Sequence, residues 1–169
     1  MEDLRPLTTE PLSLDLVNTE WIAGGVRRDL LGEPGGQATW LRSAGHAGAH
    51  ADAGALRTAR AAIRAAVADP ADAAPLNAVL AHGRLVERLD PDGPARALVV
   101  DDEGWRIAWL AAQDLLDLLR AGPERIRVCA GPGCILHFHD ASRSGRRQWC
   151  SMAACGNRAK ARRHYARTR

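Results

Sequence analysis

CAGPGC at residues 129–134 and CSMAAC at residues 150–155 hold all four cysteines of this 169-residue chain. The cysteines are Cys129, Cys134, Cys150 and Cys155, and their spacing is C-x4-C-x15-C-x4-C. Two pairs of thiolates match a closed tetrahedral zinc site. The four residues between the cysteines of each pair are the longest of the common ligand spacings. The sequence therefore predicts one structural Zn²⁺ held by these four residues.

Other uses of four cysteines fit the sequence less well. Two disulfides would need an oxidising compartment, and the sequence offers no thiol–imidazole–amide triad for catalysis. His137 and His139 follow Cys134 closely and could compete as ligands, but four thiolates already complete a tetrahedral shell. A complete shell leaves no position for water or substrate, which argues against a zinc hydrolase. Because no nucleophile–base constellation appears either, we do not expect an enzyme.

The residues around the cysteines predict how the metal site is built. The GPG turn at 131–133 lets both thiolates of the first pair face one ion. We expect a β-hairpin between residues 136–139 and 146–149, then a helix that has Cys155 in its first turn and ends near Tyr165. A knuckle, a hairpin and a helix in this order form a treble-clef finger.

The residues before the finger predict a mostly helical domain. Apolar periodicity and turn residues indicate helices over 15–20, 37–43, 52–68 and 75–89, then a last helix that stops at Gly122-Pro123. Alternation indicates strands at 96–101 and 105–109, with Trp105, Ile107 and Trp109 on one face. Residues 23–36 are glycine-rich, which predicts an exposed loop, and the arginine stripe at 57, 60 and 64 predicts a solvated helix face.

These elements define the predicted architecture. The fold class is α+β, with a mostly helical N-terminal domain that has one β-hairpin over residues 1–122. A small treble-clef zinc finger follows over residues 123–169. Because few apolar periodicities are shared across Gly122-Pro123, we expect the two parts to fold independently, so that a chelator would melt the finger alone.

The charge of the chain is unevenly distributed. Residues 120–169 contain 12 Lys and Arg against two acids, whereas residues 1–119 contain 11 against 18. Such a basic tail is an electrostatic footprint for nucleic acid, although it could also be merely solvated or dock on the acidic body. The expected phosphate contacts are Arg146, Arg147, Arg158, Lys160, Arg162 and Arg163.

Two further residues of the finger have predicted roles. Asp140 lies among arginines, and an ion pair with one of them would pin the hairpin to the helix. Trp149 would bury its ring in the finger, with base stacking as the alternative.

Neither a membrane span nor a secretory signal is expected. No apolar run approaches the length of a membrane span, and the first five residues include three charged ones. The prediction is a cytoplasmic protein without a membrane partner.

Several motifs in the finger resemble the CGNR zinc-finger family. They are FHDxSR at 138–143, RRxWCSM at 146–152 and CGNRxK at 155–160. The family usually carries an upstream ABATE domain, and LDLVNT at 14–19 resembles the opening motif of that domain. The chain departs from the family pattern at His139 and Ala141, where an aliphatic residue and a threonine are expected, but neither position belongs to the ligand set.

The resemblance implies a bacterial transcription regulator linked to stress, which contacts DNA through the finger. Our leading hypothesis is such a DNA-binding regulator, with the N-terminal domain sensing a ligand or a protein partner. The alternatives are an adaptor whose finger docks an acidic protein and a zinc-thiolate redox switch. The sequence leaves the DNA site, the effector and the oligomeric state open.

Overall fold

The computed structural model describes residues 3–167, except for the side chains of residues 163, 164 and 167. The helices are α1 (Leu12–Val17), α2 (Gly36–Ser43), α3 (Ala53–Ala68), α4 (Ala74–Leu80), α5 (Arg106–Ala121) and α6 (Asn157–Arg167). Short 3₁₀ turns are η1 (Leu30–Gly32), η2 (Glu103–Trp105) and η3 (Pro123–Arg125), and η4 (Met152–Gly156) is one turn of π-helix. The strands are β1 (Glu20–Ala23), β2 (Val26–Asp29), β3 (Gly83–Asp90), β4 (Gly93–Val100), β5 (Ile126–Val128) and β6 (His137–His139).

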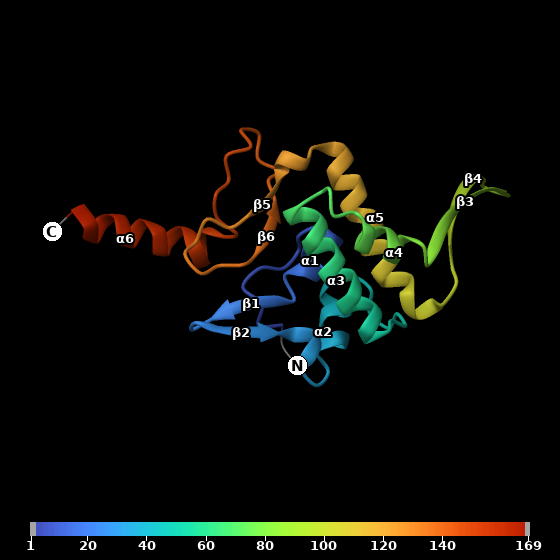
Figure 1. Cartoon of the computed structure of the whole chain (residues 1–169), viewed down its shortest axis with the longest axis horizontal. Helices are drawn as coiled ribbons and strands as arrows, with labels where there is room; N and C mark the ends of the chain where they lie inside the picture. Colours follow the sequence, from blue (N-terminus) through green and yellow to red (C-terminus); the bar gives the residue numbers. More distant parts are fainter. Residues whose placement is uncertain (1–2, 168–169) are drawn as a thin grey trace.

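Helices α3 and α5 form the centre of the fold, packed on each other and on α1 (Figure 1). The apolar residues of α3 recur at spacings of three and four, so that Leu56, Ala59 and Ile63 are buried along one stripe. The helix begins at the predicted place because the side chain of Asp52 caps it, accepting the Ala55 amide at 2.7 Å.

Each of the three sheets in the described chain is an antiparallel pair: β1–β2, β3–β4 and β5–β6. The α+β class is therefore confirmed, but the N-terminal part contains two hairpins instead of one. Residues 23–36, expected to be a loop, contain most of the additional hairpin. Gly24 and Gly25 have φ values of 58° and 80°, and a two-residue turn with both φ values positive matches the twist of a hairpin.

The second hairpin lies earlier in the chain than the alternation predicted. The helix predicted over 75–89 ends at Leu80, and residues 83–90 form β3, which pairs with β4 and projects from the body (Figure 1). Residues 105–109 are helical, because Asp102 caps the η2 turn and Ile107 continues the buried α5 stripe through Ala111 and Leu115. The predicted strand at 105–109 was therefore wrong.

Arg60 corrects the expectation of a solvated arginine stripe on α3. Its side chain is buried, and its two terminal nitrogens contact Asp29, with Nη2 to Oδ2 at 2.8 Å. Nη2 also lies 3.1 Å from a carboxylate oxygen of Glu20. The arginine therefore ties the β1–β2 hairpin to α3.

The finger hairpin also differs from the prediction. Strand β6 pairs with β5, which precedes the first cysteine, and residues 146–149 form no strand. Asp140 holds this segment as a loop, because its carboxylate accepts the amides of Ser142 at 3.0 Å and Arg147 at 2.8 Å. The predicted order of knuckle and helix is retained, with a loop in place of the second strand.

The finger and the N-terminal part share one hydrophobic core. Leu136 and Phe138 are buried in the same cluster as Leu16 and Val17 of α1. Independent folding of the two parts does not fit this packing. This packing joins residues that lie far apart in the sequence, and the apolar periodicity within a single segment could not predict it.

No helix in the described part of the chain is both long and apolar enough to cross a membrane.

Candidate metal centre and nucleic-acid interface

The four cysteines converge on one point. Their Sγ atoms all lie within 4.8 Å of one another, and those of Cys134 and Cys150 are 4.0 Å apart. A tetrahedral site with Zn–S bonds of about 2.3 Å places its sulfurs about 3.8 Å apart. Cys129, Cys150 and Cys155 are buried and Cys134 is half-buried. The cluster therefore has the composition and the size of a closed tetrathiolate metal site.

The backbone around the sulfurs is shaped for thiolates. Cys129 Sγ accepts the amides of Gly131 at 3.4 Å and Cys150 at 3.3 Å. A Cβ added at Gly131 would lie 2.8 Å from the sulfur of Cys155, so the knuckle leaves no room for a side chain there. Arg158, in the first turn of α6, donates to Cys155 Sγ at 3.0 Å. These N–H donors stabilise negative charge on sulfur.

The cysteine thiols strongly shift one another's pKa values. A hydrogen bond from the Cys150 thiol lowers the pKa of Cys134 to about 5. The same interaction raises the pKa of Cys150, and burial raises that of Cys129. Four thiolates at such distances repel each other, and a bound divalent cation is what allows all of them to lose their protons. The donor set therefore fits a metal ion.

His137 and His139 do not join this metal site. Within the described residues, the cluster of possible ligands consists of the four cysteines alone. His137 is buried in β6, and its Nδ1 atom has no hydrogen-bond partner. Burial, and to a lesser extent the charge of Arg64, lower the pKa of His137 to about 4, so its imidazole is neutral at pH 7.

Side chains of the N-terminal part cover the free edge of β6. Asn18 donates through Nδ2 to the His137 carbonyl at 2.8 Å, and its Oδ1 accepts the His137 amide at 2.9 Å. The His139 amide donates to Glu10 at 2.9 Å. Sequence reasoning did not identify Asn18 and Glu10 as contacts of the finger, and the only available signal was the LDLVNT motif.

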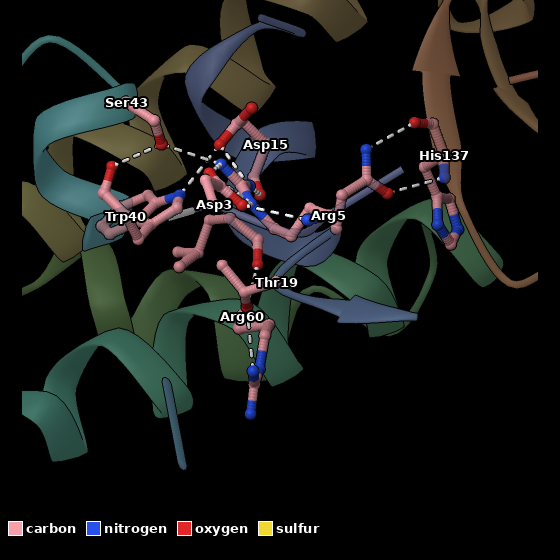
Figure 2. Close-up of polar contacts among 10 residues, drawn as sticks. Asp3, Arg5, Asp15, Thr19, Trp40, Ser43, Arg60 and His137 are labelled. Carbon is pink, nitrogen blue, oxygen red and sulfur yellow. Dashed lines mark hydrogen bonds and ion pairs between the residues drawn. The ribbon is translucent and has the colours of Figure 1, made fainter. Parts of the chain in front are cut away.

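The other polar residues of LDLVNT organise the N-terminal core (Figure 2). The Asp15 carboxylate accepts from Arg5 at 2.7 Å and from the indole of Trp40 at 2.9 Å. Thr19 accepts from Arg60 at 2.9 Å. Arg5 and Asp15 are both buried, so each is a charge that depends on its partner. The motif is thus a buried polar network that holds α1 in place and presents Asn18 to the finger.

Two of the predicted phosphate contacts have partners within the protein. The Arg147 guanidinium donates to the carbonyls of Trp149 and Cys150, contacts Glu10 at 3.1 Å and lies over the ring of Phe138. Arg158 is exposed but is bonded to Cys155.

The remaining predicted contacts lie on the exposed side of the finger. Arg146, Lys160 and Arg162 are exposed and have no ion-pair partner among the described residues. Arg163 lies on α6, and its side chain is outside the described part. Helix α6 extends away from the body and ends at the far left of Figure 1. Lys160 and Arg162 are therefore presented on a projecting helix that starts at the metal site, whereas Arg146 lies in the loop before that helix.

The contacts of Asp140 and Trp149 lie within the protein and stabilise its fold. Asp140 is buried, and hydrogen bonds from Ser142 lower its pKa to about 2, with the Arg147 amide contributing. It stabilises the loop, and among the described residues it forms no ion pair with an arginine, contrary to the expectation. Trp149 is half-buried and packs against the core cluster, as expected.

Two family models match the chain. The model described as "CGNR zinc finger" matches residues 125–168. The model named ABATE, described as "Putative stress-induced transcription regulator", matches residues 10–122. No curated protein matches the chain. Since the second match covers more than half of the sequence, the chain belongs to the ABATE family and carries a C-terminal CGNR zinc finger.

Proposed function

We propose that this protein is a DNA-binding transcription regulator whose finger is held by Zn²⁺ on Cys129, Cys134, Cys150 and Cys155. The observation that carries the proposal is the placement of α6. Its exposed cations project from the body, and its first turn is fixed to a cysteine of the metal site. A zinc tetrathiolate carries a formal charge of −2, so the finger keeps a net positive charge. The family descriptions, a transcription regulator and a zinc finger, agree with this role.

The surroundings of the six predicted cations narrow the set that we propose as phosphate contacts. Arg146, Lys160, Arg162 and Arg163 form the proposed interface, because the guanidinium of Arg147 is committed to the body of the protein. Arg158 contributes through its remaining N–H groups. Phosphate contacts position a protein on DNA without reading sequence, so base contacts from the adjoining loop or a second copy of the chain would supply specificity.

The N-terminal domain, residues 1–122, is the proposed sensor. It contacts the finger through Asn18 and Glu10, so a ligand or protein partner that changes their position changes the finger. The proposed location is the cytoplasm.

The test is selection of fragments from a genomic DNA library by the zinc-loaded protein at physiological salt. Enrichment of defined fragments, lost when Lys160 and Arg162 are both changed to Ala, supports the proposal. Absence of DNA retention, together with salt-sensitive retention of acidic proteins, would favour the adaptor instead.

A further inference from the structure

A cavity of about 340 Å³ opens on the surface of the finger, where the loop after Gly145 leads into η4. The described residues that line it are Arg146, Arg147, Gln148, Trp149, Ser151 and Met152. None of the four cysteines lines this cavity, so it is separate from the metal site. Its volume lies in the range of small-ligand sites, about 300–1,000 Å³.

The walls of the cavity are mostly apolar and include an aromatic ring. Trp149 is half-buried, packs against the core cluster and also lines the cavity, so its indole is held in place and remains partly accessible. A Cβ added at Gly156 would lie 2.6 Å from the sulfur of Met152 and 3.4 Å from Cδ1 of Trp149. Both side chains therefore lie against this glycine and form neighbouring parts of one wall. A thioether beside an indole suits a flat ring.

Two polar side chains at the cavity are free to bind a ligand. Gln148 and Arg146 are exposed, and neither side chain has a hydrogen-bond or ion-pair partner among the described residues. The backbone of Gln148 is fixed, because its carbonyl accepts the Ala130 amide at 2.9 Å. The amide of Gln148 donates and accepts hydrogen bonds, as the edge of a nucleobase does, and the guanidinium of Arg146 attracts phosphate.

This combination of groups matches a nucleotide whose base is not stacked in a duplex. Aromatic side chains with neighbouring cations bind the bases of single strands, because every base has a π-face. A base that is paired and stacked within a duplex is not accessible to such a cavity. No acidic residue is among the described residues that line the cavity, so a phosphate meets no like charge there.

We propose that this cavity binds an unpaired nucleobase of DNA. The base stacks on Trp149 and Met152, its edge bonds to Gln148, and its phosphate contacts Arg146. The η4 turn begins at Met152 and leads directly into α6, which carries the proposed phosphate contacts. The cavity therefore adds a base contact beside them, and the inference rests on the proposed function.

The test is fluorescence anisotropy of the zinc-loaded full chain with two short labelled duplexes at physiological salt. One duplex has a single unpaired thymidine, and the other has an abasic nucleotide at the same position, with the same charge and backbone. We expect the thymidine duplex to bind about tenfold more tightly, because the abasic nucleotide has no ring to stack.

Two variants test the site within the protein. Trp149→Leu keeps an apolar side chain against the core and should remove the preference for thymidine. Gln148→Leu keeps the size of an exposed side chain but loses its hydrogen bonds, and should reduce the preference about fivefold. Ser144→Leu is the matched control and should keep the full preference, because Ser144 is exposed in the same loop but does not line the cavity. Zinc content is measured for each variant, and Gln148→Leu keeps the test decisive if Trp149→Leu loses metal.

Three results would overturn the base site and leave the proposed function intact. They are equal affinities of the native chain for the two duplexes, an undiminished preference in Trp149→Leu, and equal reductions in Gln148→Leu and Ser144→Leu. Binding of neither duplex would overturn the proposed function and the base site together.

Discussion

Replacing Asn18 with Ala should weaken the attachment of the finger to the N-terminal domain. Asn18 is fully buried and makes two hydrogen bonds, of 2.8 and 2.9 Å, to the carbonyl and the amide of His137. Truncation leaves both backbone groups unsatisfied at a buried strand edge. Each buried unsatisfied group costs about 1–3 kcal/mol, so the free energy of unfolding should fall by about 2–6 kcal/mol. For a domain of ordinary stability, about 5–15 kcal/mol, this is a large fraction.

The assay is urea unfolding of the zinc-loaded chain, followed by far-ultraviolet circular dichroism. Asn77→Ala is the matched control, because Asn77 is exposed on α4 and makes no bond to the finger. Hydrogen exchange should also show faster exchange in residues 126–139 of Asn18→Ala. A loss below about 1 kcal/mol, or equal losses in both variants, would refute the claim that Asn18 joins the two parts.

Two further predictions concern metal and pH. Metal analysis should find one zinc per chain, and Cys150→Ser should abolish it; chelation should also lower the melting temperature of the N-terminal helices, because Phe138 lies in their core. If chelation left the melting temperature of those helices unchanged, the result would support independent folding of the two parts. The pKa of His137 is about 4 in the folded chain and about 6.5 when unfolded, so only the unfolded chain gains a proton as the pH falls through this window. Stability should therefore fall by about 3 kcal/mol between pH 6.5 and pH 4, and the histidine makes no contribution above that window. Zinc-saturated His137→Leu should lack this part of the loss, and identical pH profiles in urea unfolding would contradict the reasoning.

The metal site and the central helices could be predicted from the sequence because their signals are local. Four cysteines in two pairs specify a tetrathiolate cluster wherever the chain brings them together. Helix α3 combines an Asp52 cap with a buried stripe that includes Leu56 and Ile63, so propensity, capping and burial agree.

The strand pairings could not be predicted in the same way. The segment 83–90 contains apolar residues that fit a helix as well as a strand, and its pairing with β4 decides between them. Strand β5 has three residues, too few for a periodic signal. Gly24-Gly25 and Pro91-Asp92-Gly93 were missed local signals, since glycine-containing turns between short segments are typical of a hairpin.

Polar contacts between distant segments could not be predicted from the sequence either. Arg60 on α3 looked solvated because its partners, Glu20 and Asp29, lie in a hairpin that had not been predicted. The motif LDLVNT indicated a family, but the pairing of Asn18 with a strand 119 residues away follows only from the fold.

The most direct test of the central claim is the salt dependence of DNA binding. If four cations of the finger contact phosphates, log K should fall against log salt concentration with a slope of about −3.6. The Lys160→Ala/Arg162→Ala double variant should reduce the slope by about 1.8, whereas Arg42→Ala/Arg84→Ala, which removes the same charge from the N-terminal part, should leave it unchanged. A slope near zero in the native chain, or equal reductions in both double variants, would contradict DNA binding through α6.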